Sequence, residues 1–240
     1  IMDPFLIVLL VVSLYMAWSI GANDTANSVG TSVGSGVLSL RGAIIRIAIF
    51  DFLGAVLFGK AVTKTIGKGI VQTNMIGETD VIMVGALSAI LAACLWVTFA
   101  TYKKLPVSTT HSIVGGMLGF GLVVGGLKYI NFKVLAKVVA SWIISPLVGS
   151  IVAFSIYILI KNFILEKVED EIKVEKVFGY LQIMTAMFVG FSIGSNDVAN
   201  AVGPVYLVLS MGSREVEAYK VLAYGGFGIV LGTLTWGYGL

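Results

Sequence analysis

The sequence is poor in the charged residues that soluble proteins carry on their surfaces. Only 12% of its 240 residues are charged, whereas soluble domains carry about 25%. Hydrophobic residues make up 58% of the chain, and several apolar runs reach the roughly 20 residues that a helix needs to cross a bilayer. This composition predicts an all-α polytopic membrane protein, a multi-pass protein of the cell (plasma or inner) membrane.

Cysteine and histidine are almost absent, with one residue of each, Cys94 and His111. A single cysteine excludes a disulfide framework, and two such residues are too few for a dense nitrogen and sulfur metal site. The net charge of +3 is small and the basic residues form no stripe along the chain, so nucleic acid is not an expected partner. The first apolar segment, Pro4–Ile20, lacks a positive n-region and a small-residue cleavage site, so it is interpreted as a retained membrane segment.

One polar decapeptide occurs twice. Gly21–Gly30, near the start of the chain, and Gly194–Gly203, in its last quarter, agree at seven of ten positions. A carboxylate at the centre of a membrane helix costs at least about 2.5–3.5 kcal/mol, and neither decapeptide contains a lysine or arginine to pair with Asp24 or Asp197. An aspartate that only caps a helix is the plain alternative, but the duplication favours a working site.

The duplication divides the chain into a first membrane repeat at 1–160, a charged connector at 161–177 and the start of a second membrane repeat at 178–240. Each motif follows an apolar run and leads into small residues, a pattern that predicts a helix broken at the motif. Transporters commonly contain such repeats, in inverted or parallel topology. Lysine and arginine counts do not distinguish the two topologies, because positive clusters follow nearly every segment.

A second polar element, Pro106–His111, opens an apolar, glycine-rich run and is predicted to begin a short helix. A helix N-terminus attracts an oxyanion through unpaired N–H groups and the helix dipole, and the hydroxyls of Ser108, Thr109 and Thr110 add donors. Plain helix capping is the alternative. The second repeat has no counterpart of this element, so we expect the sequence to be part of a longer chain.

An anion held beside two aspartates needs a positive charge, and the motifs supply no fixed one. A mobile cation must therefore accompany it, either sodium or protons carried on the aspartates. Carboxylate, amide and hydroxyl oxygens suit a small hard cation, and the expected sodium ligands are Asn23, Asp24, Thr109, Asn196 and Asp197. Hydrogen phosphate has a proton to donate to an aspartate whereas sulfate has none, which favours phosphate. Asp51, a lone acid inside a predicted span, is either a helix-pairing residue or a secondary ion or coupling residue.

These motifs resemble the inorganic phosphate transporter (PiT) family of ion-coupled phosphate symporters. The family pattern is a duplicated Gly-Ala-Asn-Asp motif with a Pro-x-Ser-x-Thr-His element in each half, and here only the first half carries that element. The resemblance implies an inverted-repeat helical bundle with broken or re-entrant helices at a central site. It also implies an acidic residue near position 51, and a phosphate site formed by Asp24, Asn27, Ser108, Thr109, Thr110, Asp197 and Asn200.

The sequence therefore predicts a sodium-coupled inorganic phosphate symporter that works by alternating access. A proton-coupled phosphate or sulfate permease of the same fold is the alternative. An enzyme is not expected, because a lone histidine among hydroxyls forms neither a nucleophile–base pair nor a metal cluster. The expected partners are phosphate, sodium as a co-transported ligand and the lipid bilayer, with no cofactor. The sequence is compatible with a homo-oligomer.

Overall fold

A computed structural model of the protein describes residues 4–60, 69–167, 170–209 and 217–238. These residues form seven α-helices: α1 (Pro4–Gly34), α2 (Leu40–Phe58), α4 (Thr79–Tyr102), α5 (Thr109–Gly125), α6 (Phe132–Ile160), α7 (Glu171–Leu209) and α8 (Ala218–Thr235). Three short helical turns complete the described structure: η1 (Thr73–Met75), η2 (Gly126–Tyr129) and η3 (Lys161–Leu165). Apart from one isolated bridge between Val71 and Ile130, the described residues contain no β-structure.

Five of the helices are long and apolar enough to cross a membrane: α1, α4, α5 with η2, α6 with η3, and α7. The predicted all-α polytopic architecture is therefore confirmed. Helix α7 begins at Glu171, so part of the stretch 161–177 expected as a connector is helical. The span predicted around Asp51 was expected to run from Gly42 to Val62, and its last residues lie outside the described part of the chain.

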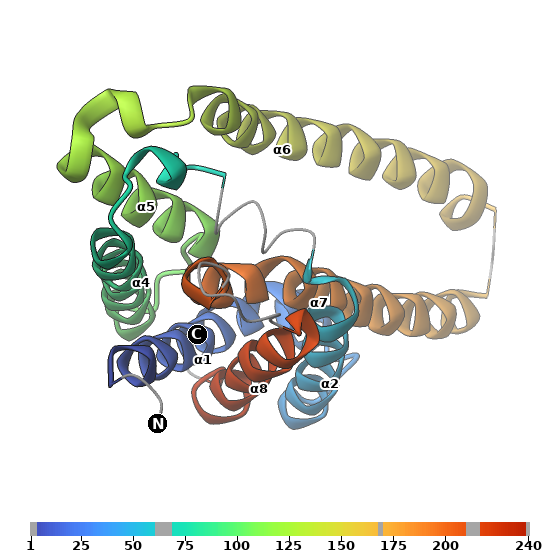
Figure 1. Ribbon diagram of the computed structural model, residues 1–240. Helices are drawn as coiled ribbons and strands as arrows, with labels where there is room; N and C mark the ends of the chain where they lie inside the picture. The colour runs from blue at the N-terminus through green and yellow to red at the C-terminus, as the bar shows by residue number, and fades with distance from the viewer. Residues whose placement is uncertain (1–3, 61–68, 168–169, 210–216, 239–240) are drawn as a thin grey trace.

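Helix α1 lies at the centre of the packing and contacts α2, α4, α7 and α8. The Ser13 hydroxyl donates to the carbonyl of Ala201 on α7 at 2.9 Å. The Tyr15 hydroxyl lies 2.7 Å from the hydroxyl of Thr98 on α4, and Tyr224 of α8 donates to a carbonyl of α1 at 2.7 Å. Figure 1 shows α1 between α4 and α8. The first motif thus lies on a helix that is held on several sides.

Each motif helix packs most closely on the second helix of the other repeat. A Cβ atom at Gly232 of α8 would lie 1.9 Å from the Trp18 carbonyl oxygen of α1, and one at Gly54 of α2 would lie 2.0 Å from the Phe191 carbonyl oxygen of α7. Only glycine permits such close approach of two backbones. Trp18 and Phe191 occupy the same position relative to their motifs, so the α1–α8 and α2–α7 crossings are equivalent.

The contacts along these helices also give their relative directions. Helices α1 and α8 run parallel, as do α2 and α7, whereas α1 is antiparallel to α7 and α2 is antiparallel to α8. For α1 and α8 the contacts are Leu10–Tyr224 and Trp18–Gly232, and for α2 and α7 they are Ile47–Gly190 and Gly59–Val198. For α1 and α7 they are Ser13–Ala201 and Ser35–Gln182, and for α2 and α8 they are Ala55–Gly226 and Gly59–Leu222.

Helix α6 runs along one side of the molecule, away from α1 and α8 (Figure 1), and none of its residues is buried. Its contacts with the core come from its first half, where Leu135, Val138 and Trp142 pack against buried residues. The ring centroid of Trp142 lies 3.7 Å from that of His111, which is in the first turn of α5. The rest of α6 presents apolar side chains outward, as expected for a helix surrounded by lipid.

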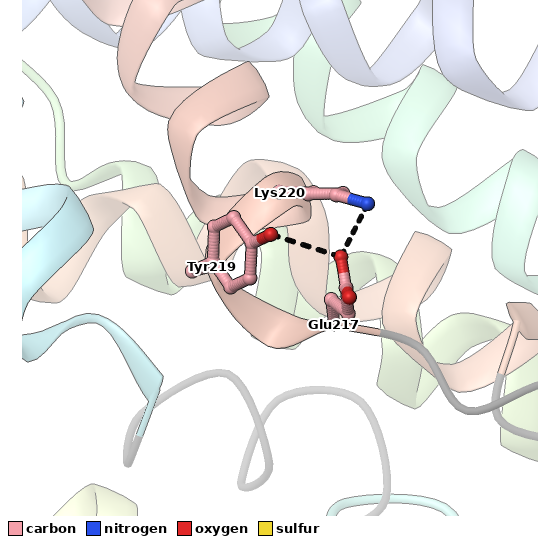
Figure 2. Close-up of polar contacts among 3 residues, drawn as sticks. All are labelled: Glu217, Tyr219 and Lys220. Atoms are coloured by element: carbon pink, nitrogen blue, oxygen red, sulfur yellow. Dashed lines mark hydrogen bonds and ion pairs between the residues drawn. The ribbon is translucent and has the colours of Figure 1, made fainter.

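Helix α8 begins with a small polar cluster at the surface. Figure 2 shows the Glu217 carboxylate accepting a hydrogen bond from the Tyr219 hydroxyl, at 3.0 Å, and forming an ion pair with Lys220. Hydrogen bonds from Lys220 and then from Tyr219 lower the pKa of Glu217. Exposed ion pairs of this kind contribute little to stability, and the Glu217 side chain does not cap the helix.

Candidate functional site

Both motifs lie on unbroken helices, so the predicted breaks are wrong. Helix α1 continues from Pro4 to Gly34 through the first motif, and α7 continues from Glu171 to Leu209 through the second. The motif glycines serve helix packing instead: a Cβ atom at Gly21 or at Gly194 would lie 2.0 Å from a carbonyl oxygen of the crossing helix. Because the backbone hydrogen bonds stay within each helix, the motif side chains are left to form the site.

The two motif aspartates are buried, with 7% of Asp24 and 8% of Asp197 exposed. The carboxylate of Asp24 accepts hydrogen bonds from Asn27 at 3.3 Å and from the Thr109 hydroxyl at 3.4 Å. Both of its oxygens are used, since Asn27 reaches Oδ1 and Thr109 reaches Oδ2. An acid of α1 is thus joined to the first turn of α5.

Asp197 accepts three hydrogen bonds, and all of them converge on Oδ1. They come from Asn196 at 3.0 Å, from Asn200 at 2.9 Å and from the Thr110 hydroxyl at 3.4 Å. The amide of Asn200 also lies 3.2 Å from the Thr109 hydroxyl and 3.1 Å from that of Thr110. The two threonines therefore stand between the aspartates, one directed at each motif.

Helix α5 begins at this point, as the sequence predicted. The side chain of Ser108 caps the helix by accepting a hydrogen bond from the backbone N–H of His111 at 3.2 Å. The residues before it form a tight turn at the end of α4, with Lys104 in the left-handed region at φ 57°. The start of α5 offers its positive end to the same space as the two carboxylates.

These groups surround a cavity of about 430 Å³. Seven of the residues that line it were predicted as phosphate or sodium ligands: Asp24, Asn27, Ser108, Thr109, Thr110, Asn196 and Asp197. Within the described residues, no lysine or arginine lines it, and its remaining walls are Pro106, Val107 and Ile193. A larger cavity of about 740 Å³ between α4 and α5 is lined mainly by apolar residues, so it offers few groups that would bind an ion.

Two predicted ligands lie behind the cavity wall. Asn200 is fully buried and reaches the threonines rather than the cavity. Asn23, also fully buried, donates to the Thr101 hydroxyl at 2.9 Å and to the Leu105 carbonyl at 3.2 Å, and its carbonyl oxygen accepts from the Val107 N–H at 3.1 Å. Asn23 therefore holds the segment that leads into α5. Sequence reasoning missed Thr101, because nothing in its apolar surroundings indicates this partner.

Asp51 is buried on α2, with 3% of its surface exposed, and is not among the residues that line the cavity. Its Oδ1 atom has no hydrogen-bond partner in the described part of the chain. It lies close enough to Asp24 and Asp197 for electrostatic interaction with both. The structure thus brings a third acid near the site, one layer behind the cavity.

The donor atoms around the cavity are carboxylate, amide and hydroxyl oxygens. No group of three or more histidine, cysteine, aspartate or glutamate side chains that could hold a metal ion occurs among the described residues. Hard oxygen donors suit sodium or a similarly small cation rather than a transition metal. The site as a whole combines a helix N-terminus suited to an anion with carboxylates suited to a cation.

Comparison with known proteins identifies the family. A sequence model described as "Phosphate transporter family" matches residues 20–240. The chain belongs to the phosphate transporter family. A predicted phosphate permease of Pyrococcus abyssi is 36% identical over an alignment of 308 residues that includes 99% of this chain and 76% of the relative. The protein is therefore a multi-pass membrane transporter and not an enzyme.

Two further relatives extend the comparison. The chloroplastic inorganic phosphate transporter 2-1 of Arabidopsis thaliana is 34% identical, with 95% of this chain and 56% of the relative aligned. A solved structure described as "The sodium-dependent phosphate transporter" superposes with a TM-score of 0.90 at 35% identity, covering 98% of this chain and 76% of that one. The Pyrococcus alignment is longer than the 240 residues of this chain, so that relative has residues inside the shared region without a counterpart here.

Proposed function

We propose that this family member is a sodium-coupled symporter of inorganic phosphate that works by alternating access. The observation that carries the proposal is the cavity in which Asp24 and Asp197 meet the first turn of α5, with no lysine or arginine in its described walls. The names of the phosphate permeases and of the sodium-dependent neighbour support the same cargo and coupling ion. The cell membrane is the expected location.

Phosphate would bind at the start of α5. The backbone N–H groups there and the hydroxyls of Ser108, Thr109 and Thr110 are hydrogen-bond donors, and the helix dipole favours a negative charge. Asn27 lines the same cavity and can donate through its amide, while Asn200 would orient the two threonines from behind. A tetrahedral anion with several acceptor oxygens matches such a set of converging donors.

Sodium would supply the missing positive charge. Two buried carboxylates and a phosphate repel one another strongly in a medium of low dielectric constant, so binding of the anion requires a cation at the same time. Asp24, Thr109, Asn196 and Asp197 present oxygen atoms at or beside the cavity. Asn23 would contribute by holding the neighbouring segment, because its carbonyl oxygen already accepts a hydrogen bond. Asp51 would act as a secondary coupling acid.

The transport cycle would use the duplicated architecture. We take residues 1–160 and 178–240 as repeats of inverted topology, supported by the antiparallel directions of α1 and α7 and of α2 and α8. In such transporters the site lies between the repeats, and one group of helices rocks against the other to expose it to each side in turn. Here the α1–α8 and α2–α7 pairs would move as rigid units, because their backbones are in direct contact.

The test is uptake of labelled phosphate by the purified protein in liposomes. Uptake driven by an inward sodium gradient supports the proposal, whereas uptake driven only by an inward proton gradient would leave phosphate as the cargo and assign the aspartates to proton transfer. Competition by excess sulfate tests the sulfate alternative. Asp24→Asn and Asp197→Asn should each abolish coupled uptake. Asp80→Asn, at an exposed aspartate in the first turn of α4, is the matched control and should retain it.

A further inference from the structure

Two buried hydroxyls on α1 have no hydrogen-bond partner in the part of the chain that the structure describes. They belong to Ser28, which is 4% exposed, and Ser32, which is fully buried. Other hydroxyls of the same helix bond back to a carbonyl one turn earlier, as Thr25 does to Gly21 at 2.6 Å. An unpaired buried polar group destabilises the folded state, so two of them on one helix need an explanation.

The two serines continue a row of oxygen atoms that starts in the cavity. Asp24, Ser28 and Ser32 follow one another at successive turns of the helix, so they lie on one face of α1 in steps of about 6 Å. At the end of the helix, the exposed hydroxyl of Ser35 donates to the side-chain oxygen of Gln182 at 3.2 Å. The row thus leads from the wall of the cavity to an exposed end of α1.

This part of α1 packs against α2 and α7. Val29, Ile47 and Met187, one from each helix, belong to the same buried cluster. Asp51 lies one turn beyond Ile47 on α2, and its unpartnered Oδ1 is a further buried oxygen on one of these three helices. The region therefore contains several buried side-chain oxygens that lack a partner.

The second motif helix packs without hydroxyls at the equivalent positions. Alignment of the two motifs places Ala201 and Val205 of α7 where α1 has Ser28 and Ser32, and both are fully buried. Helix packing in this fold therefore does not require a hydroxyl at either position. The two serines distinguish one side of an otherwise duplicated architecture.

We propose that Ser28 and Ser32 line a path along which a small monovalent cation moves between the cavity and the end of α1. Unpaired hydroxyl oxygens can coordinate such an ion, and the nearby carboxylates attract it. The inference rests on the proposed function, because it takes the ion to be the sodium that is transported with phosphate. It adds a route that serves only one side of the membrane.

The test compares uptake with thermal stability. In the double variant Ser28→Ala with Ser32→Ala, sodium-driven phosphate uptake is expected to be about tenfold slower, the effect of losing interactions of hydrogen-bond strength with an ion. The midpoint of thermal unfolding is expected to be unchanged or higher, because the substitution removes unpaired buried groups. Ser13→Ala is the matched control: this buried serine of α1 has a partner, so the variant should melt earlier yet transport normally.

The outcomes separate the path from the proposed function. If the parent protein shows no sodium-driven uptake, the proposed function fails, and the path fails with it. If the parent transports and the double variant transports equally fast, only the path is overturned. The path is also overturned if the double variant melts earlier and loses equilibrium binding of labelled phosphate in detergent, because the serines then serve the fold or the cavity itself.

Discussion

Replacing Gly21 by alanine tests whether the first helix of each repeat packs on the second helix of the other repeat. The added Cβ atom would lie 2.0 Å from the carbonyl oxygen of Ile229 and 2.8 Å from the backbone nitrogen of Thr233. Both contacts are with backbone, so α1 and α8 must separate to relieve them. Overpacking of this kind costs about 1–3 kcal/mol and occasionally more, and contacts on a rigid backbone belong at the upper end of that range.

The assay is thermal unfolding of the purified protein in detergent, followed by tryptophan fluorescence. A loss of about 3 kcal/mol lowers the midpoint by about 6–12 °C in a chain of this size. Gly30→Ala is the matched control on the same helix, because a Cβ atom there meets nothing within 4 Å. Alanine is the better helix former by about 0.5–1 kcal/mol, so this variant should melt about 1–4 °C higher.

The second crossing provides a replicate of the experiment. Gly194 is as close to the Asp51 carbonyl oxygen of α2 as Gly21 is to its own neighbour, at 2.0 Å, so Gly194→Ala should lower the midpoint by a similar amount. A Gly21→Ala protein that melts together with the Gly30→Ala control would refute the close contact of α1 and α8. The equivalence of the two crossings would then also be lost.

Three further predictions concern residues outside the cavity. Lys104→Gly should raise the unfolding midpoint, because Lys104 has a φ of 57° and the left-handed conformation costs a residue with a side chain about 1–2 kcal/mol; a lower midpoint would contradict this. Thr101→Val removes the acceptor of the Asn23 amide and should weaken equilibrium phosphate binding about three- to tenfold, with Thr98→Val as the control. Cys94 is fully buried, so a maleimide should label it only after denaturation, and rapid labelling of the native protein would place it elsewhere.

The central site follows largely from the sequence. A polar motif that occurs twice in a membrane chain predicts that Asp24 and Asp197 meet, and the structure brings both to one cavity. The Ser-Thr-Thr element was expected to face them, and Thr109 and Thr110 each contact one aspartate. The residues lie together because buried polar groups in a bilayer must find one another.

The path of the backbone through the motifs could not be predicted in the same way. Glycine beside polar residues favours a helix break when only the local sequence is considered, but Gly21 instead allows contact with Ile229, near the other end of the chain. The role of Asn23 was hidden for the same reason, since its partners Thr101 and Val107 are defined only by the folded turn between α4 and α5. Local patterns contain no information on which helix crosses which.

The packing of helices from one repeat on helices of the other has a consequence for the synthesis of the protein. Helix α2 packs chiefly on α7, so after residue 58 leaves the ribosome its glycine surface stays uncovered until residue 209 follows. At about 5–20 residues per second, that interval lasts about 8–30 seconds. One repeat alone would keep such surfaces exposed, whereas two identical copies could cover them for each other. In the present chain both sets of surfaces belong to one molecule, so each repeat covers the other without a second chain.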